Sequence, residues 1–203
     1  MTENSKRGSI TVYTGCMFSG KTDSMLTAFD RAFYAKQSFI CFKPSVDKRF
    51  GENIVKSRSK VTTIEATVLP VNGTEEDFER VLKMVEDIDL VGFDEMQFFG
   101  VWIVKLINRL RRMGKKVVLN GLDMDHRGEA FDTSCAVMGI ADETEKLHAV
   151  CSCCGADAIY SQKLINGIPV TDGSSVDVED VSGTSKTTYE ARCSNCFVYP
   201  EGI

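Results

Sequence analysis

Several features are missing from this 203-residue sequence. No apolar run approaches the ~20 residues that a membrane-spanning helix needs, so we expect no membrane span. The first ten residues, MTENSKRGSI, are polar and lack the apolar core of a signal peptide, so we expect a cytoplasmic protein. The net charge is −5, which offers no general attraction for nucleic acid. Hydrophobic residues make up 43% of the chain, which is enough for a buried core.

Cysteine, by contrast, is frequent and unevenly distributed. Of eight cysteines, Cys16, Cys41 and Cys135 are scattered, whereas five fall between residues 151 and 196. In a reducing compartment we do not expect them to form a disulfide framework. The cluster predicts a change of organisation near residue 148, with one domain over 1–148 and a second over 149–203.

The stretch TGCMFSGKTDS, residues 14–24, contains the pattern G-x-x-x-x-G-K-T. In such a P-loop the glycines let backbone amides approach phosphates, the lysine neutralises phosphate oxygens and the threonine ligates magnesium. A chance match is the alternative. The context favours function, because residues 9–14 read as a strand and residues 22–36 carry helical apolar spacing.

The rest of the first 150 residues alternates strands and helices. We predict strands over 38–42, 90–95 and 116–123, helices over 75–87 and 100–114, and a loop over 45–63. Such alternation predicts an α/β fold with a parallel sheet covered by helices on both faces.

The run IDLVGFDEMQFF, residues 88–99, is an apolar strand that ends in two acids. Asp94 matches the strand-end aspartate that positions magnesium in P-loop proteins. Glu95 would then lie near the γ-phosphate, where a carboxylate can deprotonate an attacking hydroxyl. The alternative is a pair of solvated acids, which the upstream P-loop disfavours.

Two cysteine pairs, Cys151/Cys154 and Cys193/Cys196, each have C-x2-C spacing. Four thiolates in this arrangement suit a closed, structural zinc site. Cys153 competes with Cys154 but does not give the x2 spacing, and buried apolar cysteines are the alternative. The interval from Asn166 to Thr188 is rich in Gly, Ser, Thr and Asp, and predicts a long loop with at most one short hairpin.

A zinc module on an ATPase can also indicate nucleic-acid binding. Residues 151–203 contain three Lys or Arg and seven Asp or Glu, a balance that disfavours a phosphate backbone. For His126 and His148, we expect a packed or solvated side chain rather than a catalytic one.

Taken together, these motifs resemble the thymidine kinases of the zinc-containing type. The resemblance runs from Gly8 to about Pro200. It rests on MFSGKT, KPSVDKRF, FDEMQFF, GLDMDHRGEAF, the cysteine pairs and YEARCSNC. It implies a RecA-like P-loop domain with a small zinc-binding lasso domain that closes over the nucleoside, usually as a homotetramer with feedback by thymidine triphosphate.

The implied reaction is transfer of the ATP γ-phosphate to the 5′-hydroxyl of thymidine, with ATP, Mg²⁺ and Zn²⁺ as cofactors. Glu95 matches the catalytic base, and Thr22 and Asp47 match the magnesium residues. The implied ATP-binding residues are Gly15, Cys16, Met17, Phe18, Ser19, Gly20, Lys21, Thr22, Asp94, Glu95, Met96 and Gln97. The implied substrate-binding residues are Met17, Arg49, Phe98, Leu122, His126, Phe131, Ser161 and Tyr189.

The sequence departs from the family pattern in two places. His126 stands where phenylalanine is expected, and Ser182 replaces one of two adjacent glycines in the lasso, VSGTSKTTY. The main alternative function is a P-loop ATPase switch whose zinc module binds a protein or DNA. A purely structural zinc protein is disfavoured by the intact P-loop and the acid pair.

Overall fold

The computed structural model describes residues 7–47, 54–56, 63–173 and 187–200. Arg49 lies outside these ranges, as does Ser182 with the part of the predicted lasso at 174–186.

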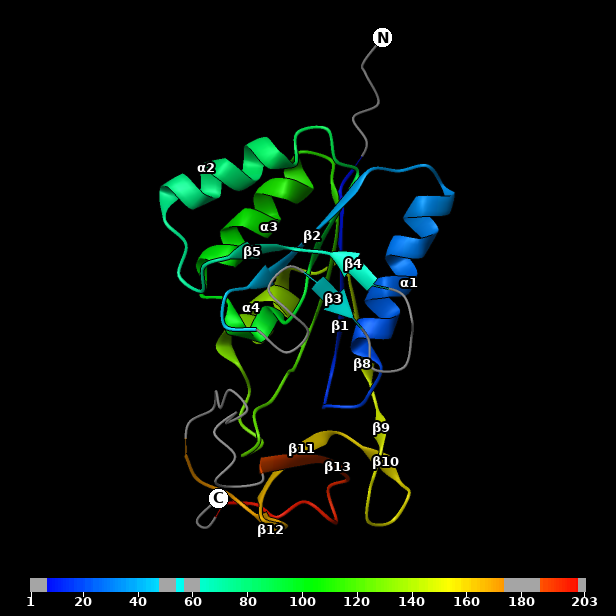
Figure 1. Cartoon of the computed structure of the whole chain (residues 1–203), viewed down its shortest axis with the longest axis vertical. Helices are drawn as coiled ribbons and strands as arrows, with labels where there is room; N and C mark the ends of the chain where they lie inside the picture. The colour runs from blue at the N-terminus through cyan, green and yellow to red at the C-terminus, as the bar shows by residue number, and fades with distance from the viewer. Residues whose placement is uncertain (1–6, 48–53, 57–62, 174–186, 201–203) are drawn as a thin grey trace.

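A six-stranded sheet, in the order β5-β2-β6-β7-β1-β8, forms the centre of the molecule (Figure 1). Every neighbouring pair in it is parallel, which confirms the predicted fold class. Its strands are β5 (Thr67–Leu69), β2 (Phe39–Pro44), β6 (Leu90–Phe93), β7 (Lys116–Gly121), β1 (Ser9–Gly15) and β8 (Glu143–Leu147).

Helices cover both faces of this sheet (Figure 1). On one face lies α1 (Lys21–Tyr34), whose apolar side chains Met25, Leu26 and Phe29 recur on a single stripe and pack against strand residues. Gly92 on β6 is needed here, because a Cβ atom would lie 2.3 Å from the ring of Phe29. The other face carries α2 (Glu75–Met84), α3 (Trp102–Arg112) and α4 (Asp132–Ile140).

Local sequence features explain where α2 begins and where α3 ends. Thr74 caps α2, since its hydroxyl accepts from the Asp77 backbone N–H while the Asp77 carboxylate accepts from the Thr74 N–H. The predicted stop of α3 is also observed, with Gly114 at φ +79° after a basic last turn. No described helix is long and apolar enough to cross a membrane.

After β8 the organisation changes from parallel to antiparallel pairing. β9 (Ala149–Val150) pairs with β10 (Asp157–Ala158), and β11 (Tyr160–Ile165) pairs with both β12 (Ile168–Pro169) and β13 (Thr187–Arg192). Asn166 and Gly167, both at positive φ, form the two-residue turn between β11 and β12. This C-terminal part lies beside the carboxyl ends of the central strands (Figure 1).

The structure corrects one prediction and adds elements that the sequence did not predict. The predicted loop over 45–63 contains β3 (Ile54–Lys56), which pairs antiparallel with β4 (Thr63–Glu65). The short 3-10 turn η1 (Met96–Phe98) follows the acid pair. Helix α4 and strand β8 were not predicted; α4 buries Thr133 and Ser134, and most of β8 is exposed and charged, so neither has a clear apolar period.

Candidate active site

The P-loop connects β1 to α1 at the carboxyl edge of the sheet. Gly15 (φ +133°) and Gly20 (φ +85°) adopt backbone angles that side chains disfavour, and a Cβ at Gly15 would lie 2.2 Å from the Leu147 carbonyl oxygen. Lys21 is buried and its Nζ donates to the Cys16 carbonyl oxygen at 2.6 Å. Ser19 Oγ donates to the same oxygen at 2.9 Å. These bonds fold the loop into a compact turn with the lysine held against it.

The acid pair lies at the end of strand β6, which β7 separates from β1 in the sheet. The Asp94 backbone N–H donates to the Phe42 carbonyl at 2.9 Å, which continues the sheet pairing. Glu95 then leaves the sheet through a left-handed conformation, φ +51°, that is uncommon for a residue with a side chain. Both acids are largely buried. The chain therefore turns sharply at Glu95, next to the P-loop side of the sheet.

One asparagine, absent from the sequence-based prediction, joins the acid to the P-loop. Asn120 on β7 accepts from the Glu95 N–H at 3.0 Å through Oδ1 and donates to Thr22 Oγ1 at 3.3 Å through Nδ2. Its side-chain amide thus fixes the relative position of the predicted base and the predicted magnesium residue. The signal in the sequence was an asparagine within the apolar strand KVVLNG, where it needs partners once buried.

A glutamine orients the Glu95 carboxylate itself. Gln97 Nε2 donates to Glu95 Oε2 at 2.5 Å, and Gln97 Oε1 accepts from the Leu122 N–H at 2.9 Å. Gly121 makes room for this amide, because a Cβ there would lie 2.4 Å from Gln97 Oε1. Both ends of the Gln97 amide are therefore hydrogen-bonded, and its Nε2 donor orients the Glu95 carboxylate.

Asp47, the second predicted magnesium residue, forms a buried ion pair. Lys43 Nζ lies 3.3 Å from Asp47 Oδ2 and donates to the Ile54 carbonyl at the same distance. The Lys43 side chain is fully buried. This lysine was also absent from the prediction, although it begins the motif KPSVDKRF.

The predicted substrate residues come from several elements around this edge. Met17 and Ser161 meet directly, since the Met17 N–H donates to Ser161 Oγ at 2.9 Å. The Phe98 N–H donates to the Glu95 carbonyl, and Leu122 is held by Gln97. Phe131 precedes α4, and Tyr189 lies on β13 opposite Lys163.

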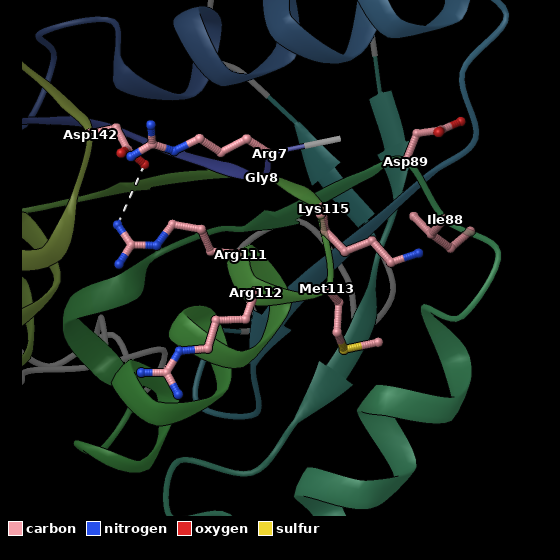
Figure 2. Close-up of a pocket in the computed structure, with 10 residues that line it drawn as sticks. Arg7, Gly8, Ile88, Asp89, Arg111, Arg112, Met113, Lys115 and Asp142 are labelled. Carbon is pink, nitrogen blue, oxygen red and sulfur yellow. Dashed lines mark ion pairs between the residues drawn. The ribbon is translucent and has the colours of Figure 1, made fainter. Parts of the chain in front are cut away.

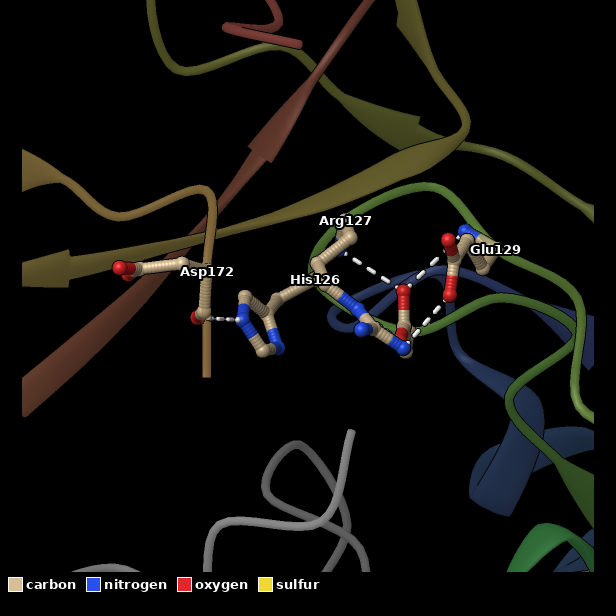
Figure 3. Close-up of polar contacts among 5 residues, drawn as sticks. His126, Arg127, Glu129 and Asp172 are labelled. Atoms are coloured by element: carbon tan, nitrogen blue, oxygen red, sulfur yellow. Dashed lines mark hydrogen bonds and ion pairs between the residues drawn. The ribbon is translucent and has the colours of Figure 1, made fainter. Parts of the chain in front are cut away.

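His126 is buried in the loop that leads from β7 to α4. Its Nε2 lies 2.9 Å from the Asp172 carbonyl oxygen (Figure 3). Since a carbonyl can only accept, Nε2 carries the proton. The adjacent Arg127 holds the loop by pairing with Asp125 and Glu129, at 2.8 and 2.6 Å (Figure 3). His148 differs, being half exposed and 3.7 Å from Asp157 Oδ2.

Four cysteine sulfurs gather in the C-terminal part. The Sγ atoms of Cys151, Cys154, Cys193 and Cys196 all lie within 4.8 Å of one another. Tetrahedral zinc with Zn–S bonds of about 2.3 Å would place its sulfurs about 3.8 Å apart, so the cluster fits zinc. A hydrogen bond from the Cys193 backbone lowers the pKa of the Cys151 thiol to about 6, whereas hydrogen bonds with the Cys154 and Cys193 thiols raise the pKa of Cys196, so zinc binding would have to release the Cys196 proton. Cys153 is exposed, outside this cluster, and contacts Arg192.

The thiol cluster and the P-loop share one small apolar core. Cys16 packs with Ala149, Ala158 and Ala191, and with the ligand-type residues Cys151 and Cys193. Cys16 Sγ also donates to the Ala158 carbonyl at 3.3 Å. Burial raises the pKa of the Cys16 thiol, so it stays protonated as a donor.

The parallel sheet, the P-loop and the strand-end acids define a P-loop α/β protein with an appended thiol cluster suited to zinc. Comparison with known proteins narrows this class. The family profile described as "Thymidine kinase" matches residues 8–197. The chain is 40% identical over 187 residues to a thymidine kinase of Coprothermobacter proteolyticus, covering 92% of this chain and 89% of that protein. It is 37% identical over 202 residues to a thymidine kinase of Mycoplasma mycoides subsp. mycoides SC, covering 98% and 92%.

The chain therefore belongs to the thymidine kinase family and is an enzyme, a thymidine kinase. A solved DNA replication initiation factor is also similar over 69% of this chain and 40% of its own, at 13% identity. Its TM-score of 0.39 is too low to bear on fold or function.

Proposed function

We propose that this enzyme transfers the γ-phosphoryl group of ATP to the 5′-hydroxyl of thymidine, giving dTMP and ADP. The observation that carries the proposal is the placement of Glu95. Asn120 ties the backbone of Glu95 to Thr22, and Gln97 orients its carboxylate. A carboxylate held beside a P-loop suits a general base for a hydroxyl acceptor, because phosphoryl transfer depends mainly on positioning and charge neutralisation.

On the donor side, the stretch 15–22 would cradle the phosphates with its backbone amides. Lys21, which now donates to the Cys16 carbonyl, would redirect its ammonium to the β and γ oxygens. Thr22 and Asp47 would hold magnesium, which supplies charge neutralisation on the phosphates. Asp94, at the end of β6, would support the same centre.

On the acceptor side, Met17, Phe98, Leu122 and Phe131 supply apolar walls for the base. His126, Ser161 and Tyr189 would complete the nucleoside site, together with Arg49. We assign residues 1–148 to an ATP-binding domain and 149–203 to a zinc-binding and lasso domain that closes over the nucleoside. A cover over the nucleoside favours transfer over ATP hydrolysis by excluding water.

Zinc in the four-cysteine cluster would be structural, because four thiolates leave no open coordination position. The contacts of Cys16 and Met17 with the C-terminal part support this role, since they connect the cluster to the P-loop. We propose a cytoplasmic location, where a reducing environment keeps the zinc-binding and the other cysteines out of disulfides. We also propose a homotetramer, which light scattering on the purified protein tests.

A screen of ADP formation across nucleosides tests the proposed reaction. Thymidine is expected to stimulate ADP release from ATP far more than adenosine or guanosine does. Stimulation by double-stranded DNA, with no response to any nucleoside, would instead assign the protein to the ATPase switches.

A further inference from the structure

A hollow of about 800 Å³ lies at the end of the sheet remote from the P-loop (Figure 2). It is lined by Gly8, Asp89 and Lys115, which directly precede β1, β6 and β7, and by Asp142, which precedes β8. The last turn of α3 and the residues after it close another side. Because the strands are parallel, this amino-end hollow is separate from the site at their carboxyl ends.

The hollow concentrates positive charge on an acidic protein. Arg7, Arg111, Arg112 and Lys115 line it, against only two carboxylates, although the chain as a whole carries −5. Both carboxylates already have partners. Asp89 Oδ2 accepts from the Ser38 N–H and hydroxyl at 3.0 and 3.1 Å.

The second carboxylate, Asp142, is engaged in the same way. Its Oδ2 accepts from the Ile10 N–H at 2.9 Å and lies 3.7 Å from Arg111 Nη1 (Figure 2). Both acids hold strand ends in place and keep their negative charge, so four cations against two carboxylates leave the lining with a net charge of +2. The Lys115 ammonium group donates to the Glu86 backbone carbonyl at 2.6 Å, an acceptor that carries no formal charge to offset it.

Two of the arginine side chains make no polar contact that would hold the described fold together. Within the described part of the chain, neither the Arg7 nor the Arg112 guanidinium has a hydrogen-bond or ion-pair partner. A basic residue at a helix C-terminus is stabilising by itself, which accounts for one charge near the end of α3. It does not account for Arg7, which comes from the other side of the hollow (Figure 2).

We propose that this hollow binds a linear phosphate chain, carried either by inorganic polyphosphate or by a nucleotide. Guanidinium groups match phosphate oxygens with paired donors, and the volume lies in the range of ligand pockets, roughly 300–1,000 Å³. Arg7 and Arg111 stand toward one side and Lys115 toward the other (Figure 2), so an elongated anion meets more of the cations than a single carboxylate does. Ile88 and Met113 add apolar surface beside Lys115.

Calorimetric titration with inorganic tripolyphosphate tests this site. The Lys21→Ala chain serves as the background, so that the P-loop contributes little to binding. One site per chain is expected, and Arg7→Ala or Arg112→Ala should each weaken it about fivefold, the effect of one nearby unit charge in water. Arg109→Ala is the matched control, because Arg109 is exposed on the same helix but does not line the hollow.

A parallel titration with ATP on the same background identifies the carrier. If Arg7→Ala and Arg112→Ala weaken ATP binding, the ligand is a nucleotide; if they affect tripolyphosphate alone, it is the inorganic chain. Either outcome supports the site. Absence of tripolyphosphate binding to the Lys21→Ala chain, or an equal loss with Arg109→Ala, would overturn it, and neither result would bear on thymidine phosphorylation.

Discussion

Ser161 Oγ lies 2.9 Å from the backbone nitrogen of Met17 and accepts its hydrogen bond, across 144 positions of sequence. The neighbouring Cys16 thiol donates to the Ala158 carbonyl at 3.3 Å. Two consecutive P-loop residues are thus held by the C-terminal part, whose β13 leads directly to Cys193. The C-terminal part therefore helps to fix the shape of the phosphate-binding loop, although the two are far apart in the sequence.

Ser161→Ala is expected to weaken ATP binding measured without nucleoside. One hydrogen bond contributes about 0.5–1.5 kcal/mol, a factor of roughly two to ten in affinity. Ser161→Thr keeps the hydroxyl and should bind ATP like the wild type. Equal affinities for the alanine and threonine variants would show that the hydroxyl does not position the loop.

Glu95→Gln should keep ATP affinity and lose at least about a hundredfold in kcat, the typical cost of removing a general base. Glu79→Gln, an exposed change on α2, is the control and should leave kcat unchanged. Steady-state kinetics with saturating thymidine and ATP measure the effect. A variant with near-normal kcat would remove Glu95 from the role of base.

Asn120→Ala should lower both stability and turnover. The change leaves the buried Glu95 N–H without its acceptor, which costs about 1–3 kcal/mol of unfolding free energy. Displacement of Glu95 and Thr22 should reduce kcat by about tenfold or more. Denaturant unfolding and kinetics together measure this, with Asn108→Ala on α3 as control. A loss of stability without a loss of kcat would restrict Asn120 to a structural role.

Purified protein should contain about one zinc per chain, as expected for a four-thiolate site. Cys193→Ser should reduce zinc content and lower the thermal unfolding temperature. Cys153→Ser, next to a ligand position but outside the sulfur cluster, should preserve both. Metal analysis decides the point, and carefully prepared protein without zinc would contradict the assignment.

The sequence predicted those parts of the molecule in which a chemical role fixes the residue types at short, set spacings. The P-loop requires glycines, lysine and threonine at set spacing between a strand and a helix, and β1 and α1 follow this rule. The acid pair ends an apolar strand as expected, and β6 stops at Phe93, directly before it. The paired cysteines carry their own spacing, and their sulfurs gather in the structure.

The parts that were missed depend on contacts between distant residues. Asn120 joins Glu95 to Thr22, and Lys43 pairs with Asp47, but a polar residue within an apolar strand shows only that it needs a partner, not which distant residue that partner is. Strand β8 consists mainly of exposed charged residues and exists because it pairs with β1 at the edge of the sheet. The antiparallel strands after residue 148 include pairs only two residues long, too short for a period to appear.

The most direct test of the proposed reaction is the identity of the product. Purified enzyme, incubated with ATP, Mg²⁺ and thymidine, should yield ADP and thymidine 5′-monophosphate in equal amounts, as measured by mass spectrometry and ³¹P NMR. The Glu95→Gln enzyme should yield little of either. Formation of ADP with inorganic phosphate but no thymidine monophosphate would contradict the proposed function.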